Sequence, residues 1–182
     1  MIKHFFRDIQ LYKSYKKSHV LKIFLDISIY MVLLYRISNF FYRNHVFIVA
    51  KIFWLLNRLL FCIDIDPGAK LGPGLRLVHP MSIVIGREVI SEGDLVVYQN
   101  VTIGGSNNKT SEYNGQIIKQ PYFKKNVILY ASSVILGPII IGENSIVAAN
   151  ATISKDVEDN NIAFGFNKTK INVTHNAEAK PN

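Results

Sequence analysis

The stretch that decides the fold is residues 64–105, which read DIDPGAKLGPGLRLVHPMSIVIGREVISEGDLVVYQNVTIGG. Aliphatic residues recur there at every sixth position, with one eight-residue step between Leu77 and Ile85 and one polar position, Ser91. The same spacing returns over residues 129–153. A period of six is typical of β-solenoids, in which each hexad forms a short strand and a turn and only neighbouring coils bury its apolar side. The twelve positions of this series predict about four three-sided coils.

The rest of the chain of 182 residues divides around this solenoid. We expect an N-terminal helical domain over residues 1–63, with helices over 19–43 and 45–63, followed by the solenoid domain over 64–175. A polar stretch over residues 106–126 lacks the six-residue spacing and predicts an inserted loop, whose length favours a functional role. Residues 176–182 predict a flexible tail.

The charge lies almost entirely in the helical part. Residues 1–62 contain ten Lys or Arg and two acidic residues, which equals the net charge of +8 of the whole chain. No nucleic-acid motif accompanies these cations, so we expect no nucleic-acid partner. An aromatic and basic segment favours peripheral association with an anionic membrane. The alternative is a helical cap that packs on itself, on the solenoid end and on other subunits.

The same segment argues against export and against a membrane span. Charged residues interrupt residues 1–22, so we expect no signal peptide. The longest charge-free run, residues 27–35, is far shorter than the roughly 20 residues that a span requires. The single cysteine, Cys62, excludes an internal disulfide and a cysteine-rich metal site. We therefore expect a cytoplasmic protein, at the inner face of the cytoplasmic membrane if the helices bind lipid.

Four motifs in the repeats carry a family resemblance: IDPGAKLGPG from Ile65, the turn at His79, IVIG from Ile83 and QNVTIGG from Gln99. They resemble the left-handed β-helix acyltransferases, specifically the serine O-acetyltransferase branch. The YRISNFFY stretch from Tyr35 is similar to short members of that branch found in polysaccharide clusters. The resemblance implies a left-handed parallel β-helix of hexapeptide repeats with an N-terminal α-helical domain. It also implies acetyl-CoA as donor, no metal, and a homotrimer with sites between subunits.

Acetyl transfer to a hydroxyl needs a base, because a neutral alcohol attacks a thioester poorly. A histidine, with an ordinary pKa near ~6.5, can take the proton at neutral pH. His79 is the single histidine within the repeats. The resemblance implies that His79 is the general base and that Asp64 orients it, as the carboxylate of a catalytic triad does.

The resemblance also implies a donor site along the solenoid, where small residues leave room for pantetheine and backbone amides stabilise the developing oxyanion. Its expected residues are Gly104, Gly105, Ala131, Ala149, Lys168 and Lys170. Residues 165–170 depart from the Gly-x-Pro-Ala-Lys/Arg segment that the family usually carries there.

Two departures concern the acceptor. Serine acetyltransferases carry an aspartate before the catalytic histidine, where this chain has Val78, and a second histidine where it has Gln120. Groups that would bind the ammonium and carboxylate of serine are therefore absent or altered, which favours a sugar hydroxyl of a surface polysaccharide or its precursor. The expected acceptor-binding residues are Asn114, Lys119, Gln120 and Tyr122.

Two other functions stay open from the sequence. One is serine O-acetylation in cysteine biosynthesis, because Lys119 retains a cation for a carboxylate. The other is a non-catalytic hexapeptide scaffold, against which the spacing of Asp64 and His79 argues. Carbonic anhydrases of this fold need three histidine ligands, which the repeats do not contain.

Overall fold

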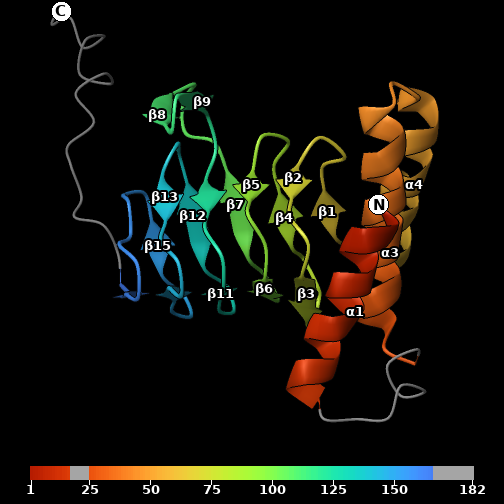
Figure 1. Cartoon of the computed structure of the whole chain (residues 1–182), viewed down its shortest axis with the longest axis horizontal. Helices are drawn as coiled ribbons and strands as arrows, with labels where there is room; N and C mark the ends of the chain where they lie inside the picture. Colours follow the sequence, from red (N-terminus) through yellow and green to blue (C-terminus); the bar gives the residue numbers. More distant parts are fainter. Residues whose placement is uncertain (17–24, 166–182) are drawn as a thin grey trace, which may run out of the picture.

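Three helices precede a solenoid of short strands in the computed structural model, which describes residues 1–16 and 25–165 (Figure 1). The helices are α1 (Ile2–Lys16), α3 (Ile27–Arg43) and α4 (Phe47–Phe61). Helix α3 begins at Ile27, because Asp26 is its N-cap and accepts a hydrogen bond from the Ser28 amide at 3.1 Å, and residues 19–24 of the predicted helix lie outside the described residues. The expected tail, Lys168 and Lys170 lie outside the described residues.

The solenoid has three parallel faces, here called sheets A, B and C. Sheet A contains β1 (Asp64–Ile65), β4 (Val84–Ile85), β7 (Thr102–Gly104), β12 (Val134–Leu136) and β15 (Thr152–Ile153). Sheet B contains β2 (Lys70–Leu71), β5 (Ile90–Ser91), β10 (Tyr122–Phe123) and β13 (Ile140–Ile141). Sheet C contains β3 (Leu75–Val78), β6 (Leu95–Tyr98), β11 (Val127–Leu129), β14 (Ile146–Val147) and β16 (Ile162–Ala163). The polar insertion forms an antiparallel hairpin of β8 (Ser111–Tyr113) and β9 (Gln116–Ile118).

The coil length follows the spacing of the hexads. Val84 pairs with Thr102 and Val134 pairs with Thr152, so an ordinary coil takes three hexads. Asp64 pairs with Val84, which makes the first coil two residues longer. The extra length lies in the turn after β3, where His79 and Ser82 both have left-handed backbone conformations, with φ of 48° and 52°. The eight-residue step in the sequence is therefore a widened turn.

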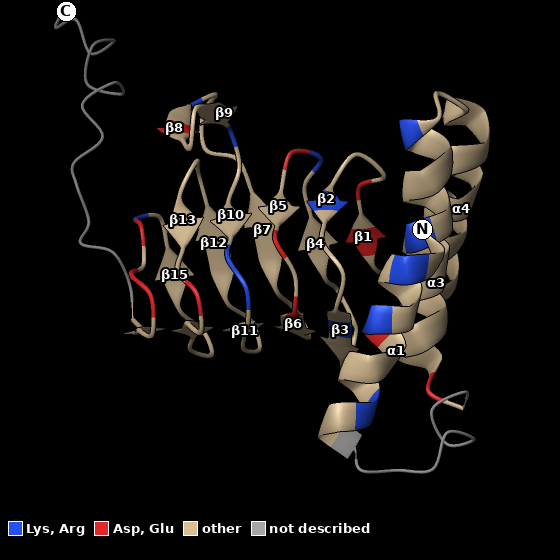
Figure 2. Ribbon diagram, in the orientation of Figure 1, with Lys and Arg blue, Asp and Glu red and all other residues tan. Residues whose placement is uncertain are grey.

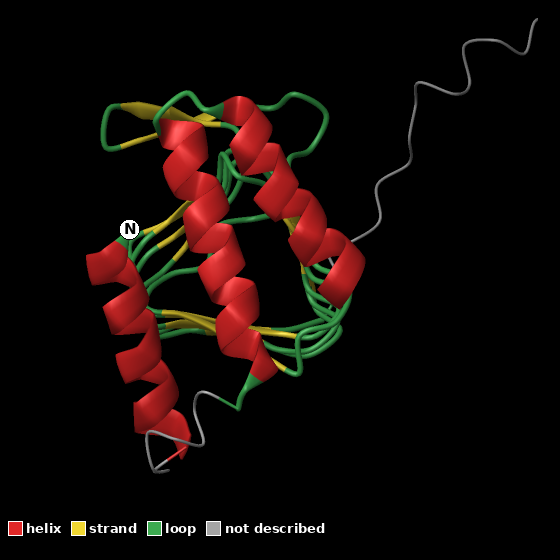
Figure 3. Cartoon of the chain, turned by 90° about the vertical axis from the view of Figure 1, so that its right-hand side faces the viewer, coloured by secondary structure: helices red, strands yellow, loops and turns green. Residues whose placement is uncertain are grey.

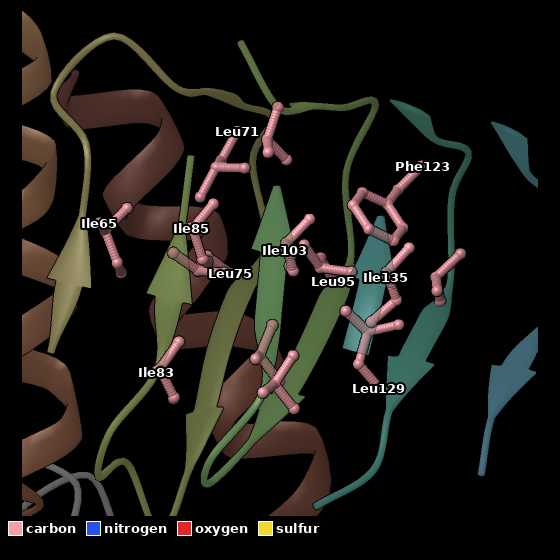
Figure 4. Close-up of a cluster of buried hydrophobic side chains, with 14 of the residues drawn as sticks. Ile65, Leu71, Leu75, Ile83, Ile85, Leu95, Ile103, Phe123, Leu129 and Ile135 are labelled. Atoms are coloured by element: carbon pink, nitrogen blue, oxygen red, sulfur yellow. The ribbon is translucent and has the colours of Figure 1, made fainter. Parts of the chain in front are cut away.

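The core is a stack of aliphatic side chains inside the solenoid (Figure 4). Within sheet B the small Ser91 lies between Leu71 and the fully buried Phe123 in adjacent coils. A small residue beside a large ring keeps the interior filled. The predicted loop over residues 106–126 ends earlier than expected, since Tyr122 and Phe123 already pair with β5 and β13. The sequence spacing misses this strand because an aromatic residue takes the aliphatic position.

The helices cover the first coil, whose strands β1, β2 and β3 are edge strands of the three sheets. Arg36 and Asp8 form a buried ion pair of 2.9 Å, with both side chains only 2% exposed. Asp8 accepts hydrogen bonds from the amides of Gly74 and Leu75, and Arg36 donates to the carbonyls of Leu71 and Gly72. These contacts satisfy the edge backbone that would otherwise be open to another chain. Figure 3 shows the three helices side by side over this end of the solenoid.

Candidate active site

His79 lies in the widened turn between β3 and β4, and its side chain is exposed. The turn runs beside the chain that enters β1, because the Ser82 amide donates to the Cys62 carbonyl at 3.0 Å. The Asp64 amide donates to the Ile83 carbonyl at 2.8 Å. The expected base and its carboxylate thus belong to the same first coil, Asp64 in its first strand and His79 in its last turn, at the corner of the solenoid where the strands of sheet A begin. Within the described part of this single chain, no hydrogen bond or ion pair joins their side chains.

Asp64 instead contacts α4. Trp54 donates from Nε1 to Asp64 Oδ1 at 2.8 Å, and Arg58 Nη1 lies 3.4 Å from Asp64 Oδ2. The Arg58 guanidinium stacks over the Trp54 ring at 5.3 Å from its centroid. Neither residue is predicted as a site residue from the sequence. The available signal is their i,i+4 spacing on a helix that ends just before Asp64.

A second group of residues lies at the next corner of the solenoid, where strands β4 and β7 of sheet A end. Lys119 Nζ lies 3.1 Å from Glu88 Oε1, and Gln120 Oε1 accepts from the Glu88 amide at 3.2 Å. Gln120 packs so closely over Gly86 that a Cβ there would come within 2.3 Å of Gln120 Oε1. Together with Gly105, the side chains of Glu88, Lys119 and Gln120 line a hollow of about 440 Å³. The predicted acceptor residues Lys119 and Gln120 therefore meet the predicted donor residue Gly105.

The other two predicted acceptor residues, Tyr122 and Asn114, do not line this hollow. The Tyr122 hydroxyl donates to Glu92 Oε1 at 3.0 Å, and its ring packs on Tyr113 at 4.8 Å between centroids. Burial and the hydrogen bond to Glu92 raise the pKa of Tyr122 to about 12, so the hydroxyl stays a donor. Asn114 is exposed in the turn of the hairpin, with φ of 50°.

The small residues expected along the donor site separate into two places. Gly104 pairs with Leu136, at the carboxyl end of β12. Ala131 and Ala149 lie before the amino ends of β12 and β15, where the Asn150 amide donates to the Ala131 carbonyl at 3.0 Å. Ala131 and Ala149 thus lie at the corner of the solenoid that contains His79, where the strands of sheet A begin. Gly104 and Gly105 lie at the corner that contains Gln120, where these strands end. One chain brings each half together but does not join the halves.

Such an arrangement has parts that suit acyl transfer. An exposed imidazole can accept a proton from a hydroxyl, and a carboxylate of the same coil can orient it. Backbone amides near Gly105 can face a developing oxyanion. The Glu88 carboxylate and the Lys119 ammonium offer one charge of each sign to a small polar molecule.

Comparison with known proteins identifies relatives of this architecture. Residues 122–155 match the family model "Bacterial transferase hexapeptide (six repeats)". The serine acetyltransferase of Helicobacter pylori is 31% identical over 137 residues, which cover 75% of this chain and 77% of that protein. The serine acetyltransferase of Synechococcus elongatus is 32% identical over 132 residues, covering 72% of this chain and 52% of that protein.

Solved structures show the same fold. A serine acetyltransferase of Neisseria gonorrhoeae in complex with serine aligns with a TM-score of 0.78 and 23% identity, covering 90% of this chain and 66% of that one. A serine acetyltransferase in complex with CoA aligns with a TM-score of 0.78 and 24% identity, covering 90% and 66%. These similarities confirm the predicted left-handed parallel β-helix with N-terminal helices.

The relatives correct one expectation. Because they are named serine acetyltransferases, the prediction of a polysaccharide sugar as acceptor is wrong, and the serine alternative is favoured. This chain spans about half the length of the relatives from Schizosaccharomyces pombe and Synechococcus elongatus, at 47% and 52%. It covers 77% of the Helicobacter pylori enzyme, so the chain belongs to the serine acetyltransferase family of hexapeptide-repeat transferases.

Proposed function

We propose that this protein transfers the acetyl group of acetyl-CoA to the hydroxyl of L-serine. The observation that carries the proposal is its similarity to the Helicobacter pylori serine acetyltransferase over three quarters of the chain. His79 accepts the hydroxyl proton as the serine oxygen attacks the thioester carbonyl. The carbonyl–sulfur bond then breaks, and the proton goes to the departing CoA sulfur. Asp64 orients the imidazole.

Charges in the hollow beside Gly105 support a zwitterionic acceptor. Serine carries an ammonium and a carboxylate, and each needs an opposite charge where water is partly excluded. The Glu88 carboxylate suits the ammonium and Lys119 suits the carboxylate, once the two separate from their present contact of 3.1 Å. Gln120 adds an amide that can donate to the serine carboxylate or accept from its hydroxyl.

We further propose that the active enzyme is a homotrimer, because one chain carries the two halves of the site at the two corners that bound sheet A, where its strands begin and where they end. Packing of one protomer beside the next would bring the corner with His79 of one protomer against the corner with Gln120 of its partner. Ala131 and Ala149 would then lie along the cleft between protomers as the smooth wall for pantetheine. The roles of Lys168 and Lys170 toward CoA phosphates stay predictions.

The acceptor is tested by CoA release. The protein is incubated with acetyl-CoA and either L-serine or D-serine, the free thiol is measured continuously, and O-acetylserine is identified by mass spectrometry. Saturable release with L-serine, and much slower release with D-serine, is expected. CoA release that stays at the rate of hydrolysis at every L-serine concentration would refute the proposed function.

We also propose that the helical domain, residues 1–63, docks on an anionic membrane surface. Docking on a surface requires exposed apolar area and positive charge. None of the described helices is long and apolar enough to cross a membrane. Helix α4 exposes a ridge of Ile48, Ile52, Leu55 and Leu59, with Ile48 78% and Leu59 70% exposed. Basic residues lie along α1 (Figure 2), on the other side of α3 from α4 (Figure 3), and an end of the molecule that carries both an aliphatic ridge and cations fits an anionic leaflet.

A further inference from the structure

We propose that Trp54 and Arg58 of α4 position the Asp64 carboxylate, so that the helical domain supplies part of the acetyl-transfer machinery. The inference rests on the proposed function, in which Asp64 orients His79. It assigns both α4 residues as positioning residues, which act through Asp64.

The contacts engage both oxygens of the carboxylate. Trp54 Nε1 donates to Oδ1 at 2.8 Å, which fixes the rotation of the carboxylate about its terminal bond. Arg58 Nη1 lies 3.4 Å from Oδ2, and the stacking of its guanidinium on the Trp54 ring holds the cation in place. A carboxylate has about four lone-pair sites, so acceptor capacity remains for an imidazole N–H. Asp64 is therefore oriented and yet available.

A purely structural role explains these contacts poorly. The side chains of Arg58 and Asp64 are 53% and 31% exposed, and ion pairs this open to water contribute little to stability. Helix α4 is already anchored elsewhere, because buried Asn57 donates to the Met31 carbonyl at 3.1 Å and Ser38 donates to the Ala50 carbonyl at 2.7 Å. A precise arrangement that adds little stability is what a positioning role requires.

The charge of Arg58 predicts an effect on the pH profile. Proton transfer places a positive charge on the imidazole, which the Asp64 carboxylate stabilises and the Arg58 cation opposes. Removal of the Arg58 charge should favour the protonated imidazole and move the acid limb of the kcat/KM profile to higher pH. The other charged groups nearby are Lys51, Asp66 and Arg87, which line one hollow with Trp54, and Asp66 and Arg87 pair with each other at 3.3 Å. The remaining titratable groups are Cys62 at the end of α4 and His79 in the adjoining turn.

The test compares Trp54→Phe, Arg58→Ala, Arg58→Lys and Asp64→Asn with the wild-type protein in the serine-dependent CoA-release assay. Lys51→Ala is the matched control, because it removes one exposed cation from the same helix. Trp54→Phe keeps a ring but loses the donor, and the loss of a hydrogen bond to a charged group predicts roughly a ten- to hundredfold lower kcat with KM for serine nearly unchanged. Arg58→Ala should lower kcat and shift the acid limb upward, whereas Arg58→Lys should restore the profile. Thermal melting by circular dichroism shows which variants are folded.

Different outcomes separate the two ideas. Wild-type protein that does not acetylate serine would overturn the proposed function and this inference together. An active wild type with an inactive Asp64→Asn, and with kcat and pH profiles of Trp54→Phe and Arg58→Ala equal to those of Lys51→Ala, would overturn this inference alone. Full activity of Asp64→Asn would also overturn it. A lower kcat in folded Trp54→Phe, together with the pH shift in Arg58→Ala, supports it.

Discussion

At the scale of single residues, His79 combines exposure with a strained backbone. Its φ of 48° lies in the left-handed region, which few residues other than glycine and asparagine adopt without strain. The two extra residues of the first coil are accommodated in its turn, so the conformation belongs to the widening of the turn. A strained residue that the surrounding structure holds in place is a candidate for function.

Replacement of His79 tests this role. His79→Asn removes the base while keeping a residue that tolerates the left-handed region, so folding should be preserved. We expect kcat for serine acetylation to fall about 10²- to 10⁴-fold, the range for loss of a general base. Steady-state CoA release measures the effect, and circular dichroism checks the fold. Turnover close to that of the wild type would mean that His79 is structural.

The sequence names His79, Asp64 and Lys119 as candidate site residues, which stay predictions, but it does not show which side chains contact Asp64 and Lys119. The spacing of repeats and the resemblance identify positions along the chain. Trp54 reaches Asp64 from a helix, and Glu88 reaches Lys119 from another coil, so only the fold brings them together. The wrong sugar prediction has the same origin. It weighed Val78, Gln120 and the cation of Lys119 but no anion for the ammonium of serine, whereas the structure places the Glu88 carboxylate next to Lys119 as a pair of opposite charges.

At the scale of elements, the helices complete the solenoid. The buried Arg36–Asp8 pair and its four hydrogen bonds to backbone groups join α1 and α3 to the turn between β2 and β3. Tyr35 adds a hydrogen bond from its hydroxyl to the Ala69 carbonyl at 2.8 Å. A polar pair buried this deeply is tolerated because every charge has a partner.

Loss of one partner should therefore be severe. Arg36→Met leaves Asp8 as an unpaired buried carboxylate, and we expect a loss of about 3–5 kcal/mol in the free energy of unfolding. Arg7→Met is the matched control on α1, since the Arg7 pair with Asp94 is 45% and 20% exposed and should cost about 0–1 kcal/mol. Denaturant titration of both variants measures the difference. Equal losses in the two would contradict the sealing role of the buried pair.

The hexad spacing predicts the solenoid strands well because each inward position must be apolar to be buried by the next coil. Two elements escape it for physical reasons. Strand β10 uses Phe123 at an aliphatic position beside Ser91, and the hairpin β8–β9 pairs by itself, outside the repeat. Helix α1 is predicted only as part of a helical domain, since charged residues interrupt its apolar ones, and one of them, Asp8, accepts hydrogen bonds from solenoid amides.

At the scale of the whole molecule, the division of the site predicts assembly. We expect light scattering to give the mass of a trimer, and activity to fall when dilution dissociates it. Mixing an inactive His79→Asn protein with an inactive Lys119→Met, Gln120→Ala protein should restore activity, because some interfaces then pair two intact halves. A monomer with full activity would contradict a site shared between protomers.

The exposed ridge of α4 gives the last prediction. Ile48 and Leu59 form one contiguous ridge with Ile52 and Leu55, and a contiguous exposed apolar patch marks an interaction site. A flat surface can meet all three helices because they lie side by side over one end of the solenoid (Figure 3). Between copies related by a twofold axis, the basic residues of the two helical domains would repel each other, whereas an anionic leaflet attracts them.

We expect the protein to sediment with vesicles that contain phosphatidylglycerol, less at high salt and little with phosphatidylcholine alone. Ile48→Ser with Leu59→Ser should weaken binding, while Ile117→Ser, which removes an equally open side chain from the distant hairpin, should not. Sedimentation indifferent to lipid charge and salt would contradict membrane docking, and self-association lost in the α4 variant without vesicle binding would assign the ridge to contacts between copies of the chain.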